Sequence, residues 1–154
     1  MTTTDSRKEE LQVIIRKMKE DDLEGVMEID RKITDQDRAV TYSDVPRSFL
    51  GGQLDMSVVA EADNRVVGFL FGQMVSLPYQ RDDIALAQIM GVDPEYRRRR
   101  IGQRLMRALF ECCKTQGADS VHVMVSVHDW EMLAFLRSLD FVHGEIAEFV
   151  KSLE

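Results

Sequence analysis

Apolar positions in the middle of the chain follow the two-residue period of β-strands. This period predicts strands at residues 57–61 and 65–75, and Asp63-Asn64 between them has the composition of a tight turn. We therefore predict an antiparallel hairpin. A third strand at 84–92 has apolar residues on both faces, which is typical of a fully buried strand.

The period changes to that of a helix after the 84–92 strand. Ile101 and Leu105 begin a run of apolar residues at helical spacing that ends at Gly117. Valines then alternate along residues 121–127, which predicts another strand. Because a strand, a helix and a strand in this order form a crossover, we expect the two strands to run parallel in a right-handed unit.

Both ends of the chain carry further predicted elements. They are a strand at 11–16, a helix capped by Asp21 or Asp22 with Leu23, Val26, Met27 and Ile33 on its apolar face, a short helix from Ser43, a helix capped by Asp129 through Leu139, and a strand at 141–151. We expect residues 1–11 to form a flexible polar arm. No repeat or linker divides residues 12–154, so we predict a single domain there.

The composition fits a globular protein. The 154 residues are 44% hydrophobic and 31% charged, and 20 Lys+Arg against 27 Asp+Glu give a formal net charge of −7. No apolar run approaches the roughly 20 residues that a membrane-spanning helix needs. The N-terminus lacks the apolar core of a signal peptide, so we expect a cytoplasmic location and no membrane partner.

Several kinds of catalytic or metal site are disfavoured by the sequence. Cys112 and Cys113 are neighbours in a predicted helix, so we interpret them as core residues and not as a disulfide. The three histidines lack metal-ligand spacing, and we predict no metal. The motifs of serine hydrolases, P-loop nucleotidases and dinucleotide enzymes are also missing.

One segment departs from the acidic composition of the rest. Arg97, Arg98, Arg99 and Arg100 lead into the predicted helix, and residues 97–107 contain no acid. Cationic side chains are unfavourable at the positive end of a helix dipole, whereas a bound anion there is favourable. Free backbone N–H groups and guanidinium forks suit phosphate, so we predict a phosphate-bearing ligand.

Two alternatives to a phosphate ligand exist for the arginine run. A solvated basic helix end needs no ligand. Nucleic acid is disfavoured because the chain is acidic and has no wider basic stripe, so we expect no nucleic-acid partner.

The same junction resembles a known cofactor motif. Residues 92–106 are Val-Asp-Pro-Glu-Tyr-Arg-Arg-Arg-Arg-Ile-Gly-Gln-Arg-Leu-Met, which is similar to the acetyl-CoA-binding motif of the Gcn5-related N-acetyltransferases (GNAT). Arg97 opens the core of that motif and Gly102 closes it, whereas Arg100 stands where the family usually has glycine. The order of predicted elements also resembles that of the family over most of the chain.

The resemblance implies a fold and a cofactor. The fold class would be α/β (α+β), with a mixed, mostly antiparallel central sheet, a splayed pair of parallel strands and helices on both faces. Acetyl-CoA would lie in the gap of the splayed pair, against strand backbone and the amides of the following loop. The residues implied to bind the cofactor are Met90, Gly91, Val92, Arg97, Arg98, Arg99, Arg100, Ile101, Gly102, Gln103 and Trp130.

The usual acid of the family is missing. Many members have a tyrosine on the last helix that protonates the leaving thiolate, and alignment from Phe141 places Leu136 at that position. Trp130 likewise replaces a frequent asparagine. The resemblance therefore leaves protonation of the thiolate to water or another group.

Three side chains are candidate catalytic residues. His128, at the end of a predicted strand, is a candidate base, or else a surface or capping group. Gln88 lies in an apolar strand and either orients a water or pairs with a neighbouring strand. Glu61, on the hairpin, faces either an acceptor site or solvent.

Charge alone suggests the acceptor. Acidic residues lie in the helix and loop that resemble the acceptor wall of the family, namely Asp30, Asp35, Asp37, Asp44 and Asp55. Such a field attracts a cation, although an acidic surface also serves solubility.

These observations give two hypotheses. The first is an N-acetyltransferase that transfers an acetyl group from acetyl-CoA to a primary amine, on a small cationic amine or a peptide or protein, by direct attack in a ternary complex. The second is a non-catalytic acyl-CoA-binding sensor or regulatory module, because the usual tyrosine and glycine are replaced. A homodimer through pairing of the 141–151 strand is a separate hypothesis.

Overall fold

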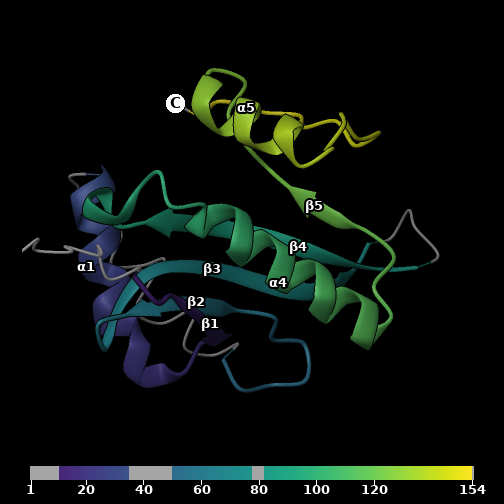
Figure 1. Ribbon diagram of the computed structural model, residues 1–154. Coiled ribbons are helices and arrows are strands. Elements are labelled where there is room, and N and C mark those ends of the chain that lie inside the picture. The colour runs from purple at the N-terminus through teal and green to yellow at the C-terminus, as the bar shows by residue number, and fades with distance from the viewer. Residues whose placement is uncertain (1–10, 35–49, 78–81, 154) are drawn as a thin grey trace, which may run out of the picture. The chain divides into compact units, whose positions relative to one another are not determined.

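The structure is a computed structural model that describes residues 11–34, 50–77 and 82–153. The chain divides into two compact units, Met1–Val123 and Met124–Glu154, which are described separately. The first unit contains the sheet and the helices that cover it, and the second contains one helix (Figure 1).

A five-stranded sheet in the order β1-β2-β3-β4-β5 forms the centre of the first unit. Its strands are β1 (Ile14–Lys17), β2 (Val58–Ala62), β3 (Arg65–Ser76), β4 (Asp83–Val92) and β5 (Val121–Val123). The pairs β1–β2, β2–β3 and β3–β4 are antiparallel, and β5 runs parallel to β4. The mixed sheet with one parallel pair is therefore confirmed.

Two helices cover opposite faces of the sheet (Figure 1). Helix α1 (Leu23–Thr34), which follows the 3₁₀ turn η1 (Glu20–Asp22), packs in one core cluster with Phe69 and Phe71 of β3. Helix α4 (Ile101–Gln116), which follows the 3₁₀ turn η2 (Pro94–Tyr96), crosses the other face over the glycines of β3. Phe69 and Phe71 alternate along β3 with the glycines under α4, and alternate residues of a strand point to opposite faces of the sheet. The prediction of helices on both faces is therefore confirmed.

The glycines of β3 let α4 lie close to the sheet. A Cβ atom on Gly68 would lie 3.0 Å from Ile101 Cγ2, and one on Gly72 would lie 3.0 Å from Leu109 Cδ1. Cys113 follows on the same helix and is buried, and burial raises the pKa of its thiol. Its interpretation as a core residue is confirmed.

Most predicted elements are confirmed, with changes at their ends. The hairpin forms, and Asp63 and Asn64 both have positive φ at its turn. The strand predicted at 121–127 is paired only from 121 to 123, and the 84–92 strand is partly exposed. In the second unit, the N–H of Met132 donates to the carboxylate of Asp129, which caps α5 (Trp130–Ser138) as predicted.

The terminal strand at 141–151 is wrong. The described residues of Met124–Glu154 contain no strand, so a strand there would have no ladder partner within its own unit. Val142, Phe149 and Val150 of this segment are exposed. The short helix from Ser43 and residues 1–10 of the expected arm lie outside the described residues, and the single domain at 12–154 stays a prediction.

Gly72→Val tests the close packing of α4 on the sheet. We expect a loss of about 1–3 kcal/mol in the free energy of unfolding, because the added side chain meets Leu109 and the carbonyl oxygen of Met56. Urea titration measures it. Gly144→Val is the control, since a Cβ there has no neighbour within 4 Å. Equal stability of both variants would contradict the close packing.

Candidate functional site

The two parallel strands pair over a short distance and then separate. The register of β4 with β5 covers Ala85–Ala87 and Val121–Val123 only. On its other side β4 stays paired with β3 as far as Val92. Within the described part of Met1–Val123, no strand therefore borders β4 from Gln88 to Val92 on the β5 side. This edge contains the predicted residues Met90, Gly91 and Val92.

A β-bulge marks the point where the strands separate. Gly72 of β3 is opposite Ala87 and Phe71 is opposite Ile89, so Gln88 is the extra residue of β4. Bulges of this kind turn a side chain away from the regular pleat, and they are frequent beside active sites. The side chain of Gln88 is exposed, and its Nε2 donates to Oε1 of Gln73 at 3.4 Å. Both interpretations of Gln88 stay open, since the amide pairs with β3 and is also accessible.

Asp93 fixes the loop that follows β4. Its N–H donates to the carbonyl oxygen of Val67 at 2.8 Å, and its carboxylate accepts the N–H of Glu95 and the Nζ of Lys32, both at 3.0 Å. Burial favours a raised pKa for Asp93, but the hydrogen bonds from Glu95 and Lys32 outweigh it and hold the pKa below the ordinary range. The carboxylate is therefore charged and fully engaged at neutral pH.

The four arginines form the turn between η2 and α4, and we call residues 93–100 the arginine loop. Arg98 and Arg100 have φ of 64° and 59°, in the left-handed region that favours glycine. This conformation explains why the resembling motif usually has glycine at the position of Arg100. A non-glycine residue costs about 1 kcal/mol there.

Helix α4 begins with unpaired backbone donors. Its first helical bond runs from the N–H of Arg104 to the carbonyl oxygen of Arg100 at 3.0 Å, and no side chain caps the helix. Among the described residues, no acceptor faces the N–H groups of Ile101, Gly102 or Gln103. Such groups need an acceptor from solvent or a ligand.

The arginine side chains complete an anion-binding donor set. None of Arg97–Arg100, Arg104 or Arg107 forms an ion pair within the described residues, and Arg99 lies 5.5 Å from the ring centroid of Tyr96. Free N–H groups at a helix start and unpaired guanidiniums are the donors that bind phosphate groups. The residues present therefore fit the diphosphate of a CoA-type ligand.

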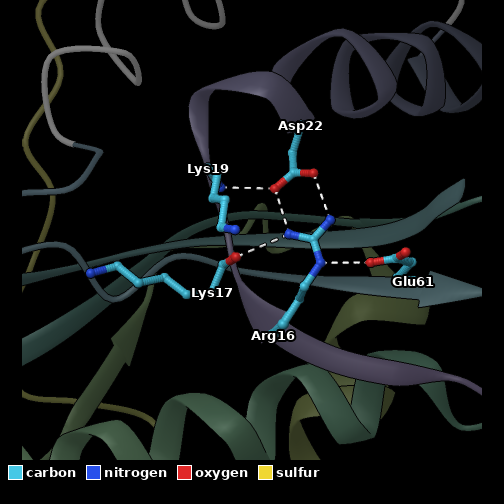
Figure 2. Close-up of polar contacts among 5 residues, drawn as sticks. All are labelled: Arg16, Lys17, Lys19, Asp22 and Glu61. Carbon is cyan, nitrogen blue, oxygen red and sulfur yellow. Dashed lines mark hydrogen bonds and ion pairs between the residues drawn. The ribbon is translucent and has the colours of Figure 1, made fainter. Parts of the chain in front are cut away.

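Glu61 belongs to an ion-pair cluster on the far edge of the sheet (Figure 2). Arg16 of β1 donates Nε to Glu61 at 2.6 Å and both Nη atoms to Asp22 at 2.8 Å, and the N–H of Lys19 donates to Asp22 as well. The pKa of Arg16 is raised above its ordinary range, mainly by the hydrogen bonds to Asp22 and secondly by the one to Glu61. These contacts join β1, β2 and η1, so Glu61 has a structural partner on β1.

His128 and Trp130 lie in the second unit, Met124–Glu154. The N–H of His128 donates to Oγ of Ser126 at 3.2 Å, and Trp130 is exposed at the first position of α5. Leu136, at the position where the family usually has tyrosine, is buried. The roles predicted for His128 and Trp130 stay predictions.

The expected acidic field at the acceptor wall needs a correction. Asp30 and Asp55 are buried, each 4% exposed. Asp55 accepts the N–H groups of Gly51 and Ser57, both at 2.9 Å, so it stabilises a turn. Short polar side chains often satisfy nearby backbone in this way, and composition does not distinguish them from surface charge. Asp35, Asp37 and Asp44 lie outside the described residues.

A cavity lies along α1, from η1 to the last turn of the helix. Its volume is about 460 Å³ and its described lining is Glu20, Asp21, Leu23, Glu24, Met27 and Arg31. None of the donors at residues 97–103 is among these lining residues.

The described residues contain neither a candidate metal site nor a candidate membrane span. No group of three or more His, Cys, Asp or Glu side chains among them could hold a metal ion. No helix in residues 11–34, 50–77 and 82–153 is both long enough and apolar enough to span a bilayer.

Sequence comparison gives one family match and one curated relative. Residues 54–143 match the family model described as the acetyltransferase (GNAT) domain. N-acetyltransferase family 8 member 3 of Rattus norvegicus is 29% identical over 100 residues, which cover 64% of this chain and 43% of the relative. The chain thus aligns with less than half of that relative.

Structure comparison finds the same fold in several proteins. Aminoglycoside N-acetyltransferase AAC(6′)-Iy in complex with CoA has a TM-score of 0.80 and 16% identity, over 93% of this chain and 96% of that one. The aminoglycoside acetyltransferase meta-AAC0020 from an uncultured soil metagenomic sample has a TM-score of 0.76 and 21% identity, over 92% and 97%. A transcriptional regulator from Bacillus halodurans C-125 has a TM-score of 0.79 and 20% identity, over 92% and 100%. At these identities the likeness shows a shared fold.

Asp22→Asn tests the ion-pair cluster through its dependence on pH. Burial would raise the pKa of Asp22, but the hydrogen bonds from Arg16 and Lys19 outweigh it and lower the pKa. The pKa of Asp22 is lower in the folded protein than in the unfolded chain, where it is about 4, so the charged carboxylate stabilises the fold at pH values above about 4. This contribution is lost as the pH falls through the pKa of the folded state. We expect a loss of about 1.5–3 kcal/mol at pH 7 that shrinks towards pH 3.

Urea unfolding at the two pH values measures this loss. Glu111→Gln, which removes the exposed ion pair with Lys114, is the control and should change stability little at either pH. A loss in Asp22→Asn that is independent of pH would contradict a contribution from the charged pair.

Proposed function

This chain belongs to the acetyltransferase (GNAT) family, and on that premise we propose that it transfers an acetyl group from acetyl-CoA to a primary amine. The observation that carries the proposal is the donor set at the start of α4. Three unpaired N–H groups and unpaired arginines lie directly after a strand whose outer edge has no strand partner. The strand edge suits an extended polar ligand, and the donor set suits its phosphates.

The cofactor would be held mainly by backbone. We assign the amide-bearing pantetheine arm to the β4 edge at Met90, Gly91 and Val92, and the diphosphate to the N–H groups of 101–103 with Arg97–Arg100. Acetyl-CoA supplies an activated thioester when bound. Backbone donors keep their positions without side-chain ordering, which favours a fixed orientation of the ligand.

The chemistry requires a neutral amine aligned with the thioester. Orientation alone contributes roughly 7–11 kcal/mol to such reactions, so few catalytic side chains are needed. We propose that Gln88, exposed at the bulge, orients a water that accepts the proton from the amine. His128 is the second candidate for this role. Because Leu136 cannot donate a proton, water would protonate the leaving thiolate.

The acceptor class follows from charge and from the neighbouring structures. The chain has a formal net charge of −7, and two of the similar structures are described as aminoglycoside acetyltransferases. We propose a cationic amine, either a small molecule or an amine on a peptide. A cytoplasmic location and the lack of nucleic-acid and membrane partners remain our predictions. A homodimer also stays a prediction, although the described residues of 141–151 do not form the strand through which we expected it to pair.

Isothermal titration with acetyl-CoA tests the cofactor site. We expect the parent protein to bind, and the Arg97→Ala/Gly102→Glu double variant to bind about tenfold or more weakly, because a carboxylate then competes for the helix N–H groups. An acid in the first helical turn is compatible with folding. Lys114→Ala, at the far end of the same helix, is the matched control and should bind as the parent does. A parent protein that does not bind acetyl-CoA would contradict the proposal.

Amine-dependent release of thiol tests catalysis. We expect turnover with cationic amines, and in Gln88→Ala a kcat lowered by about tenfold or more at unchanged affinity for acetyl-CoA. His128→Ala, assayed in parallel, tests the second candidate. A kcat equal to that of the parent in Gln88→Ala would exclude the role given to Gln88.

A sensor function is the second candidate. It is favoured by buried Leu136 at the usual tyrosine position and by Arg100 in a left-handed conformation where the family usually has glycine. Binding of acetyl-CoA without thiol release across a panel of amines would support this function over transfer.

A further inference from the structure

The last turn of α1 touches the proposed cofactor site at two adjacent residues. Lys32 forms a 3.0 Å ion pair with Asp93, the residue that follows β4. Ile33 packs over β4 itself, since a Cβ on Gly91 would lie 3.0 Å from Ile33 Cδ1 and 2.7 Å from Phe69 Cε1. One helical turn thus contacts both the strand edge and the start of the arginine loop.

Lys32 is the cationic side chain that forms an ion pair with the buried carboxylate of Asp93. The Asp93 side chain is 2% exposed, whereas that of Lys32 is 36% exposed. Its other hydrogen-bond donor is the N–H of Glu95, and the positive charge of Arg65 lies near enough to act on it. On the side of Lys32, the neighbouring charges are Glu28 and Glu95. A buried carboxylate that loses its cation must move towards solvent or take up a proton.

Movement of Asp93 would shift the proposed phosphate donors through η2. The carboxylate accepts from Glu95, and the carbonyl oxygen of Asp93 accepts the N–H of Tyr96 at 2.8 Å, so Asp93 sets the path of η2. Arg97 follows η2 in extended conformation and leads into the left-handed residues Arg98 and Arg100. The direction of the N–H groups at the start of α4 therefore depends on how Asp93 is held.

We propose that Lys32 is a positioning residue for the arginine loop, on which it acts through Asp93, so that acetyl-CoA binding and the last turn of α1 are energetically coupled. This inference rests on the proposed function. Lys32 contacts no proposed phosphate donor itself. By reciprocity, a ligand that orders the loop also orders the last turn of α1.

The test compares affinity with stability in Lys32 variants. We expect Lys32→Met to raise the Kd for acetyl-CoA about fivefold or more, and Lys32→Arg to restore most of the affinity. Lys114→Met removes the other described lysine–carboxylate pair, which is exposed, and should leave the Kd unchanged. Asp93→Asn combined with Lys32→Met should raise the Kd by less than the two single changes would together, because both remove the same contact.

Hydrogen exchange, first on the parent protein and then on Lys32→Met, gives a second measurement. Acetyl-CoA should slow amide exchange in residues 31–34, and this protection should be lost in Lys32→Met. A lowered melting temperature with unchanged Kd would overturn the proposal and leave Lys32 a purely structural role. Unchanged exchange in residues 31–34 with bound acetyl-CoA would also overturn it. A parent protein that does not bind acetyl-CoA would instead overturn the proposed function, so the two failures are distinct.

Discussion

The separation of β5 from β4 after Ala87 is the constraint on which the proposed site depends. A parallel neighbour along the whole of β4 would satisfy its outer backbone groups and leave no polar edge for a ligand. The bulge at Gln88 occurs at this same point, so the strand changes direction where it loses its neighbour. The chain then passes through Asp93 into α4, which places unpaired helix donors at the end of an unpaired strand edge.

Helix α1 connects strand β1 with the end of strand β4 through an ion pair near each end of the helix. Near its start, Arg16 and Asp22 join the helix entry to β1, and near its end Lys32 joins it to Asp93 after β4. Its apolar face packs on Phe69 and Phe71 between these points. The helix therefore connects the edge of the sheet at β1 with the arginine loop, and the carboxylate of Glu61 takes part in this framework through its ion pair with Arg16.

Local patterns were sufficient to predict most of the architecture. The turn at Asp63-Asn64, the crossover and the Asp129 cap each follow from neighbouring residues. The anion site at Arg97–Gln103 was also predicted from neighbouring residues, and it stays a prediction. What the sequence did not reveal are contacts between distant residues. Nothing near Lys32 indicates a partner at Asp93, and nothing in Asp30 or Asp55 distinguishes a buried carboxylate from a surface one. The strand predicted at 141–151 is wrong because apolar composition alone does not supply the neighbouring strand with which a strand has to pair.

The left-handed residues of the arginine loop have a consequence for the free energy of folding. Glycine at Arg100 would relax the backbone of the folded loop, but it would also raise the conformational entropy of the unfolded chain. Arginine favours backbone conformations outside the left-handed region, so the elements on either side, η2 and α4, have to hold it there. The loop therefore keeps this shape only as long as both flanking elements stay in place.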